Sequence, residues 1–385
     1  MRIAILTKEL PYPAHKSGGA NTILNLFKNM NGPQIDIVYI KTAEEKDEAH
    51  SLNQLKKIFN DIIIINHRPP NHLILKIKAL LSMQSVKSLE LYNEEVSNKL
   101  NEYDFVFIHD LPMIKYCSII KKNKIFFVCD SPFKLTDSYL KNESSPLKKV
   151  ILHLKKRVYH NMFRKNMRHF GKLLYISEVD LYHDRQIYPD LKGISDYINN
   201  GVDLDYFKPV SEDVIYDVVF VGNLGYKPNA DAAEHLVKNI VPKLVEYKNN
   251  IKCIVVGKNP SDHLKSFTSE HVAFTGFVDD IRSYVHKSSV FVSPLYSGAG
   301  MKNKILEAMS MNKLIIGSSI SFEGISIKTE YMIEANNDDE FIEKIARYLK
   351  DYDMYKDDIN NRQELEKEYS WLSQSNKLLS LINSR

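Results

Sequence analysis

The chain contains little cysteine and no long hydrophobic run. Its 385 residues include only three cysteines, Cys117, Cys129 and Cys253, which lie far apart. This spacing gives neither a disulfide framework nor a metal site, and it fits a reducing compartment. No segment approaches the roughly 18 apolar residues that a membrane-spanning helix needs. The four-residue apolar run near the amino terminus is also shorter than a signal-peptide core, so we expect a cytoplasmic protein.

Two nucleotide-binding fingerprints are also missing. The first turn, YPAHKSGGANTILNLF, lacks the spacing G-x-G-x-x-G, and no acidic residue ends the second strand-like run, IDIVYI. Nothing in the sequence matches the phosphate-binding pattern G-x-x-x-x-G-K-[ST]. A nicotinamide-dependent enzyme is therefore disfavoured, and no P-loop is present.

The chain does contain two series of strand-like runs rich in Ile, Val and Phe. The first series is 2–7, 35–40, 61–66, 104–110 and 124–130; the second is 216–223, 251–257, 271–277, 289–295, 313–319 and 331–335. Continuous apolar strands that alternate with helices indicate parallel sheets covered on both faces. The length suits two domains of about 150 to 200 residues each. We predict an α/β protein with two doubly wound, Rossmann-like domains that face one another across a cleft.

A connection between the domains is indicated at 199–213, NNGVDLDYFKPVSED, which contains Asn-Gly, Pro and acidic residues. We expect the amino-terminal domain over 1–205 and the carboxyl-terminal domain over 206–365. The segment 366–385 is typical of a helix, and we expect it to pack back towards the amino-terminal domain. The D-x-D spacing at Asp203 and Asp205 is too short a match to predict a cation, so we expect no metal site.

The first candidate site follows the first strand. Gly18 and Gly19 precede a helix whose apolar positions begin at Ile23. Paired glycines bring the backbone close to a ligand, and free amide groups at a helix start bind anions. The alternative is an ordinary tight turn.

A histidine ends the strand-like run DFVFIHD. His109 therefore lies at the carboxyl end of a strand, where ligands bind in such sheets. A histidine there can position a sugar hydroxyl or pass a proton near neutral pH. The alternative is a histidine bonded to a neighbouring loop, and Asp110 could play the same part.

The first turn of the second domain, FVGNLGYKPNADAAEHL, has similar features. Gly222 follows the strand directly, Asn223 offers a side-chain donor, and Lys227 can reach a phosphate. Pro228 and Asn229 then begin the next helix, with Asn229 as a good N-cap. The alternative is a capped helix start with an incidental lysine.

The stretch SGAGMKNKILEAMSMNKLIIGSS, residues 297–319, combines a glycine-rich turn, cations and a carboxylate. The first-turn amides of its helix, with Lys302 and Lys304, could hold two phosphate charges without a metal. Glu307 lies more than one turn into this helix, where a carboxylate is unexpected unless it accepts hydrogen bonds from ligand hydroxyls such as a ribose diol. The alternative is a salt bridge to Lys302 or Lys304, worth about 0.3 to 0.5 kcal/mol.

The segment 144–177 contains no Asp or Glu. Its basic residues are Lys148, Lys149, Lys155, Lys156, Arg157, Arg164, Lys165, Arg168 and Lys172. Interleaved apolar residues predict a basic amphipathic helix, which can lie on an anionic membrane with each cation adding about 1 kcal/mol. The alternative is a solvated face over an apolar core stripe. Residues 71–89 could extend the same surface, and no recognised module supports a nucleic-acid partner.

These features together resemble family 4 of the retaining glycosyltransferases, glycosyl transferases group 1, which have the two-domain GT-B fold. The resemblance covers nearly the whole chain. It rests on SGGA after the first strand, YISE at 175–178, NNGVDLDYFKP at the junction, FVGNLGYKPN in the second domain, and GAGMKNKILEAM followed by IIGSS. In that family the carboxyl-terminal domain holds a nucleotide sugar, and the amino-terminal domain holds the acceptor.

The resemblance implies a role for each matching residue. Glu307 would bind the nucleotide ribose and Asn303 would line the sugar and diphosphate, while His109, Lys227 and Lys302 would be catalytic. Lys227 would neutralise the leaving diphosphate without a metal. The donor-binding residues predicted from the turns and the resemblance together are Gly18, Gly19, Gly222, Asn223, Gly300, Met301, Asn303, Lys304 and Glu307. The nucleotide sugar is a co-substrate, and no further cofactor is implied.

Two positions depart from the family pattern. The family commonly has a second glutamate eight residues before Glu307, where this chain has Ala299, and an arginine where this chain has Asn223. A subgroup involved in bacterial surface polysaccharides has a similar G-x-G-x-x-x-K-x-L-E-A-M pattern. The resemblance implies a retaining, metal-independent transfer of a sugar to a saccharide or lipid-linked acceptor. From the basic segment 144–177 we expect a cytoplasmic protein that is peripheral on the inner face of the cell membrane. A nucleotide-sugar epimerase and a non-catalytic partner subunit are the alternatives.

Overall fold

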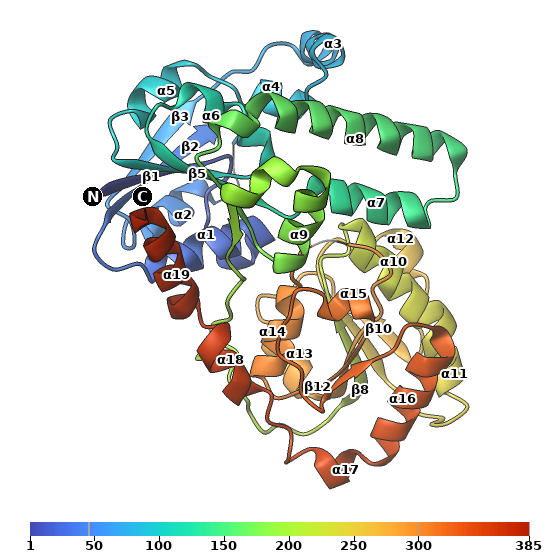
Figure 1. Ribbon diagram of the computed structural model, residues 1–385. Helices are drawn as coiled ribbons and strands as arrows, with labels where there is room; N and C mark the ends of the chain where they lie inside the picture. Colours follow the sequence, from blue (N-terminus) through green and yellow to red (C-terminus); the bar gives the residue numbers. More distant parts are fainter. Residues whose placement is uncertain (45–46, 299, 385) are drawn as a thin grey trace. The chain divides into compact units, whose positions relative to one another are not determined.

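The computed structural model describes residues 1–44, 47–298 and 300–384, and the chain divides into two compact units (Figure 1). The amino-terminal unit comprises Met1–Asn200 together with the chain from Trp371 onward, and the carboxyl-terminal unit comprises Gly201–Ser370. Ala299, which takes the place of the first family glutamate, lies outside the described residues.

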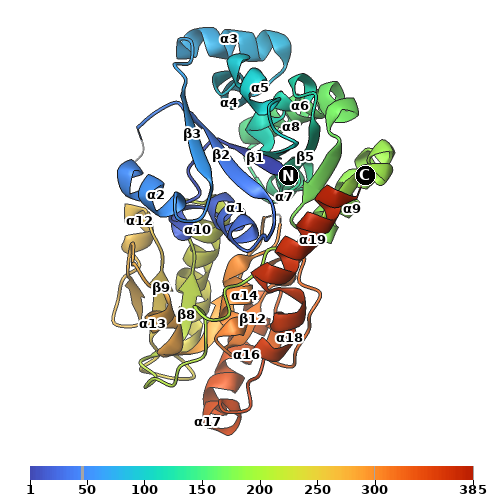
Figure 2. The ribbon, with the colours of Figure 1, turned by 90° about the vertical axis from the view of Figure 1, so that its left-hand side faces the viewer.

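The amino-terminal unit is built on a parallel sheet of seven strands in the order β3-β2-β1-β4-β5-β6-β7, part of which is visible in Figure 2. Consecutive side chains of β1 and β4 are buried, so helices cover both faces of the sheet. The strands are β1 (Arg2–Thr7), β2 (Gln34–Lys41), β3 (Asp61–Asn66), β4 (Phe105–His109), β5 (Asn123–Cys129), β6 (Lys172–Tyr175) and β7 (Ser195–Tyr197).

The helices of this unit include the last helix of the chain. They are α1 (Gly18–Lys28), α2 (Glu48–Leu55), α3 (His72–Ser82), α4 (Val86–Glu90), α5 (Glu95–Leu100), α6 (Tyr116–Ile119), α7 (Pro132–Asn142), α8 (Pro146–Asn166), α9 (Glu178–Ile187) and α19 (Trp371–Asn383). Helix α19 packs against α1 through a face on which Trp371, Leu378 and Ile382 are buried. Lys172 also donates to the Leu381 carbonyl at 3.0 Å, so the end of the chain is tied to this unit.

The carboxyl-terminal unit has a parallel sheet of six strands in the order β10-β9-β8-β11-β12-β13. The strands are β8 (Tyr216–Val221), β9 (Cys253–Val256), β10 (Val272–Phe274), β11 (Ser288–Ser293), β12 (Leu314–Gly317) and β13 (Met332–Glu334). Its helices are α10 (Lys227–His235), α11 (Val241–Leu244), α12 (Asp262–Lys265), α13 (Arg282–His286), α14 (Asn303–Ser310), α15 (Ser319–Phe322), α16 (Asp338–Lys350), α17 (Tyr352–Tyr355) and α18 (Arg362–Glu368).

Each sheet reverses its strand order once. In the amino-terminal unit the reversal lies between β1 and β4, and in the carboxyl-terminal unit it lies between β8 and β11. The loops that follow two such strands diverge to opposite sides of the sheet and leave a crevice at the carboxyl edge. The residues that follow β1, β4, β8 and β11 are therefore placed to bind ligands.

The two doubly wound domains predicted from the sequence are present, and the structure adds two strands that the apolar runs did not predict, β6 and β7. The helix expected over 144–177 is wrong at its end. Helix α8 stops at Asn166, and Lys172–Tyr175 forms β6, because Leu173, Leu174 and Tyr175 are buried in the sheet beside β5. In the described residues, no helix combines the length and the apolar character needed to cross a membrane.

Candidate functional site

The loop after β11, residues 294–302, is held at its base by buried hydroxyl groups. Ser318, the N-cap of α15, donates from Oγ to the Leu295 carbonyl at 2.6 Å. Ser321 Oγ donates to the Ser293 carbonyl at 2.5 Å. The serines of the IIGSS motif and of α15 therefore fix the end of β11, where the loop begins.

The loop then turns into α14 through two glycines in left-handed conformations. Gly298 has φ +141° and Gly300 has φ +68°, values that side-chain-bearing residues rarely adopt. Helix α14 begins at Asn303, and the side chain at its cap position, Lys302, makes no capping bond. The Lys302 amine donates to the Gly300 carbonyl, and Met301 is buried under the turn. A helix start without a side-chain cap, beside a lysine, is suited to an anion.

Lys304 and Glu307 lie one turn apart on α14 in a part-buried environment. The Lys304 amine donates to Asn229 Oδ1 at 3.1 Å and lies 4.3 Å from the centre of the Phe220 ring. Burial lowers the pKa of Lys304 to about 7, helped by the Lys302 charge and opposed by Glu307. Burial likewise raises the pKa of Glu307 to about 7, opposed by the Lys304 charge.

Both shifts mean that the protein's surroundings disfavour the charged forms of the two side chains. An anion beside Lys304 would favour its protonated form, and hydroxyl donors beside Glu307 would favour its ionised form. The pair is therefore matched to a ligand that carries negative charge and a diol at neighbouring positions.

The loop after β8 contacts the same lysine through Asn229. The structure corrects the sequence expectation here: α10 begins at Lys227, two residues before the expected N-cap at Asn229, because Pro228 occupies the first turn. Asn229 Nδ2 donates to the Asn223 carbonyl at 3.2 Å, while its Oδ1 accepts from Lys304. Asn229 thus links the two loops on either side of the strand-order reversal.

Close contacts explain the glycines of this loop. A Cβ at Gly222 would lie 2.8 Å from Asn229 Cγ, and a Cβ at Gly257 would lie 1.7 Å from the Gly222 carbonyl oxygen. Asn223 Oδ1 accepts from the Gly225 amide at 3.1 Å, which closes the turn. Gly257, after β9, was missed in the sequence; its signal was a glycine directly following an apolar run.

Lys227 points to a different environment from Lys304. Its amine pairs with Asp231 at 2.5 Å, and the two side chains are 63% and 47% exposed. An exposed pair of this kind contributes about 0.3 to 0.5 kcal/mol, so a ligand phosphate could displace Asp231 at little cost.

Asp203, the first residue of the D-x-D spacing, has a structural role in a turn. Its Oδ1 accepts from the Tyr206 amide at 3.0 Å.

In the amino-terminal unit, His109 is buried at the carboxyl end of β4. Its ring stacks on Phe127, with centroids 6.0 Å apart, and its Nε2 lies 3.4 Å from Cys129 Sγ. Its Nδ1 has no hydrogen-bond partner within the described part of the chain. Burial lowers the pKa of His109, so its imidazole is neutral at neutral pH.

The two glycines at the start of α1 differ in their relation to His109. A Cβ at Gly19 would lie 2.8 Å from His109 Cε1 and 3.5 Å from Glu9 Oε1, whereas a Cβ at Gly18 meets nothing within 4 Å. The cap of α1 is Ser17, whose Oγ accepts from the Ala20 amide at 3.0 Å and donates to Glu9 at 2.8 Å. Gly19 therefore makes room for the histidine ring.

Two residues at this edge were missed in the sequence, Lys8 and Glu9, which directly follow the first strand. The Lys8 amine pairs with the Asp110 carboxylate. Burial is the largest single effect and would raise the pKa of Asp110, but the charge and hydrogen bond of Lys8, with smaller effects of His109 and the Leu111 amide, together lower that pKa below its usual value. Asp110 and Cys129 have φ +77° and +65°, which costs of order 1–3 kcal/mol each and is typical of functional sites.

The contrast between Gly18 and Gly19 gives a direct test of the His109 environment. We expect Gly19→Ala to displace the His109 ring and to change its ¹H–¹³C chemical shifts, because the new methyl group would overlap the ring carbon. Gly18→Ala is the matched control and should leave those shifts unchanged. Unchanged His109 shifts in Gly19→Ala would contradict this packing.

The raised pKa of Glu307 predicts a pH-dependent stability. Between pH 4.5 and about 7 the folded protein keeps the proton of Glu307, whereas the unfolded chain releases it. The free energy of unfolding therefore falls as the pH rises through this window, and it stays lowered above it. Lys304, with a pKa of about 7, is mainly neutral at pH 8 whether residue 307 is Glu or Gln. Its contribution to stability is therefore the same in the natural protein and in Glu307→Gln.

We therefore expect Glu307→Gln to stabilise the ligand-free protein by roughly 1 to 3 kcal/mol at pH 8 and to have little effect at pH 5. Thermal unfolding at the two pH values measures the difference. Glu246→Gln, which removes an exposed carboxylate paired with Lys243, is the control and should change neither value. An equal effect of Glu307→Gln at both pH values would refute the raised pKa.

Comparison with known proteins supports the fold and the class of enzyme. Residues 216–351 match the family model described as glycosyl transferases group 1. A Klebsiella pneumoniae protein, described as an uncharacterized 44.6 kDa protein in the cps region, is 23% identical over 383 residues, with 91% of each chain covered.

Solved structures of similar architecture cover essentially the whole chain. HepE from Anabaena in complex with UDP and glucose is 14% identical, with a TM-score of 0.69 and 100% of each chain covered. Sucrose-phosphate synthase from Thermosynechococcus elongatus is 13% identical, with a TM-score of 0.72 and coverage of 99% of this chain and 98% of that one. The chain therefore has the GT-B fold, its residues 216–351 match glycosyl transferases group 1, and the protein is a glycosyltransferase.

Proposed function

We propose that the protein transfers a sugar from a nucleotide-sugar donor to a saccharide or lipid-linked acceptor, with retention of configuration and without a metal ion. The observation that carries this proposal is the part-buried pair of Lys304 and Glu307 on α14, beside the reversal of strand order in the carboxyl-terminal unit. HepE, which shares the fold, has been solved with UDP and with UDP-glucose, and this supports a nucleotide-sugar donor here.

The proposed donor site uses the start of α14 for the diphosphate. Lys302, Lys304 and the first-turn amides stabilise the negative charge that grows on the nucleoside diphosphate as the sugar–oxygen bond breaks. Gly298 and Gly300 leave room for the phosphates to approach the backbone. Glu307 accepts hydrogen bonds from the ribose hydroxyls, and Asn303 lines the sugar.

The transfer step balances without a metal. The bond between the anomeric carbon and the diphosphate oxygen breaks, and its electron pair stays on the nucleoside diphosphate. The acceptor hydroxyl oxygen bonds to the anomeric carbon from the face that the diphosphate leaves, which retains the configuration. The hydroxyl proton passes to the departing diphosphate oxygen.

In the amino-terminal unit, neutral His109 offers a hydrogen bond to a sugar hydroxyl through Nδ1.

We further propose that the protein is peripheral on an anionic membrane through the segment 144–177. Four apolar residues of α8 lie on the surface, Leu147, Val150, Ile151 and Leu154, while Met162 and Phe163 at the other end of the helix are in the core. The first half of α8 thus has the exposed apolar and basic residues of an interfacial helix, and the second half anchors it to the unit. The Klebsiella pneumoniae relative from a cps region supports a role in bacterial surface polysaccharide synthesis.

A panel of nucleotide sugars tests the proposal, scored by nucleotide release in the presence of candidate acceptors. We expect one donor to be consumed at the same rate with and without a chelator. Strict dependence on a divalent cation would refute the metal-independent mechanism. Conversion of a donor sugar without any acceptor would indicate an epimerase, and nucleotide binding without turnover would indicate a non-catalytic subunit.

Glu307→Ala tests the donor site itself. We expect it to weaken donor binding about ten-fold or more. The substitution removes the carboxylate that accepts hydrogen bonds from the ribose hydroxyls, and a hydrogen bond to a charged group contributes about 1.5 to 3 kcal/mol. Glu246→Ala, which removes an exposed carboxylate of the same unit, should leave the affinity unchanged. Calorimetric titration with the donor measures both, and equal affinities would remove the proposed role of Glu307.

A further inference from the structure

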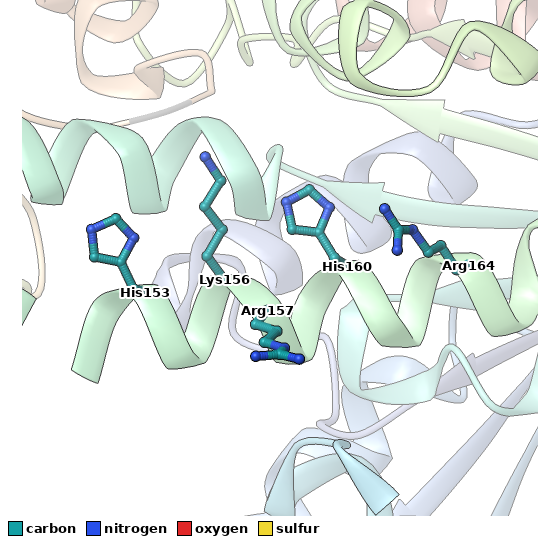
Figure 3. Close-up of a pocket in the computed structure, with 5 residues that line it drawn as sticks. All are labelled: His153, Lys156, Arg157, His160 and Arg164. Carbon is teal, nitrogen blue, oxygen red and sulfur yellow. The ribbon is translucent and has the colours of Figure 1, made fainter. Parts of the chain in front are cut away.

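A second candidate binding site lies on α8, the helix that we propose to contact a membrane. A pocket there is lined by His153, Lys156, Arg157, His160 and Arg164. Every one of these side chains carries basic nitrogen atoms, and among the described residues no carboxylate lines the pocket. Figure 3 shows His153, Lys156, His160 and Arg164 following one another along one side of the helix, while the Arg157 side chain points in another direction.

The row follows from helical spacing. Residues 153, 156, 160 and 164 recur at intervals of three, four and four, so they share one face of α8 and span about 16 Å. Lys156, Arg157 and Arg164 carry fixed positive charges, and a histidine lies within four residues of each of them. Three cations on one stretch of helix make this surface suited to an anion.

The neighbouring elements compensate this charge only in part. Asp137 of α7 accepts from the Lys156 amine at 2.5 Å and also lies 3.6 Å from His183 of α9. Asp184 of α9 is buried and accepts from Ser131, at 2.5 Å, and from Tyr175, at 2.7 Å. Asp137 thus pairs with Lys156 of the row itself, while Asp184 is held by Ser131 and Tyr175, so Arg157 and Arg164 supply the charge that these two carboxylates do not pair with.

His160, in the middle of the row, lies close to positively charged side chains. His160 stacks on Phe133 with centroids 4.5 Å apart, and its Nδ1 lies 2.6 Å from the Tyr188 hydroxyl. Burial lowers the pKa of His160, and the charges of Lys156 and Arg164 lower it further. An anion in the pocket would raise that pKa, so His160 is a natural reporter of anion binding.

Exposed apolar residues adjoin the pocket. Leu80 and Leu81 of α3 are 75% and 80% exposed, an unusual state for leucine in a folded protein. Asn161 of α8 donates to the carbonyls of Ser82 and Met83 at 3.1 and 2.7 Å, so the end of α3 is fastened beside α8, as Figure 1 also shows. Together with the four exposed apolar residues of α8, this surface suits a ligand that has both a phosphate and a hydrocarbon chain.

We propose that the α8 pocket binds the phosphate or diphosphate group of a lipid. Arg157 and Arg164 can each hold phosphate oxygens through two parallel N–H donors, while His153 and Lys156 add further donors. The exposed apolar side chains of α3 and of the first half of α8 contact the lipid chain. The inference rests on the proposed function in one respect: it takes the acceptor to be lipid-linked and identifies the part of it that this chain recognises.

Binding of farnesyl diphosphate, measured by calorimetry without any nucleotide sugar, tests the pocket. We expect Arg157→Gln combined with Arg164→Gln to weaken binding at least ten-fold, since each substitution removes a charge-assisted contact with the phosphate. The control combines Lys121→Gln with Lys122→Gln, which makes the same charge change at an exposed site of the same unit. Circular dichroism verifies that both double variants are folded.

Three further arms separate the sources of the phosphate. Vesicles of phosphatidylcholine with phosphatidylglycerol test a membrane headgroup, and inorganic pyrophosphate tests a soluble anion. With each ligand the pKa of His160 is followed by NMR, and it should rise when the pocket is filled. Loss of vesicle binding in the pocket variant, with farnesyl diphosphate binding intact, would assign the pocket to a membrane headgroup and overturn its role in binding a lipid-linked acceptor. Pyrophosphate binding as tight as that of farnesyl diphosphate, and equally sensitive to the pocket substitutions, would overturn the lipid part of the proposal.

Equal losses in the pocket variant and the control, or no binding by the natural protein, would overturn the site altogether. These outcomes are distinguishable from failure of the proposed function. Donor binding and its dependence on Glu307 are measured on the other unit and need no lipid, so the two sets of results can succeed or fail separately.

Discussion

The reversal of strand order in each parallel sheet is the constraint on which the candidate sites depend. A sheet whose crossovers proceed in both directions must leave one crevice at the carboxyl ends of two neighbouring strands. In the carboxyl-terminal unit these strands are β8 and β11, whose loops are joined where Asn229 accepts from Lys304. In the amino-terminal unit they are β1 and β4, and there Gly19 makes room for His109. The strand order of the sheet thus brings residues that are far apart in the sequence to the same crevice.

Stability and function are opposed in the carboxyl-terminal crevice. Burial disfavours the charged forms of both Lys304 and Glu307, so the ligand-free protein keeps an arrangement that lowers its own stability. The buried hydroxyls of Ser318 and Ser321 hold the loop in place regardless of a ligand. A preorganised site of this kind does not have to rearrange when negative charge develops on a leaving diphosphate.

Much of the fold could be predicted from the sequence because buried parallel strands are continuous apolar runs, and β1 and β3 match their runs to the residue. Strands β6 and β7 were missed because they are short and polar residues flank them. Gly19, His109 and Glu307 could be found because a glycine, a histidine or a carboxylate is conspicuous at a strand end or on an apolar helix face. The partners of these residues could not: nothing local indicates that Asn229 bonds to Lys304 rather than capping α10, or that Lys8 pairs with Asp110. Such contacts join residues about 75 to 100 positions apart, and only the tertiary fold determines them.

The proposed donor site depends above all on Glu307, which we propose recognises the ribose of a nucleotide whose diphosphate lies at the start of α14. The most direct measurement compares the affinities of a ribonucleoside diphosphate and its 2′,3′-dideoxy analogue for the natural protein and for Glu307→Gln, by calorimetry. We expect the natural protein to prefer the ribonucleotide and the substitution to remove most of this preference, while the dideoxy analogue should bind both proteins alike. An undiminished preference in Glu307→Gln would contradict it.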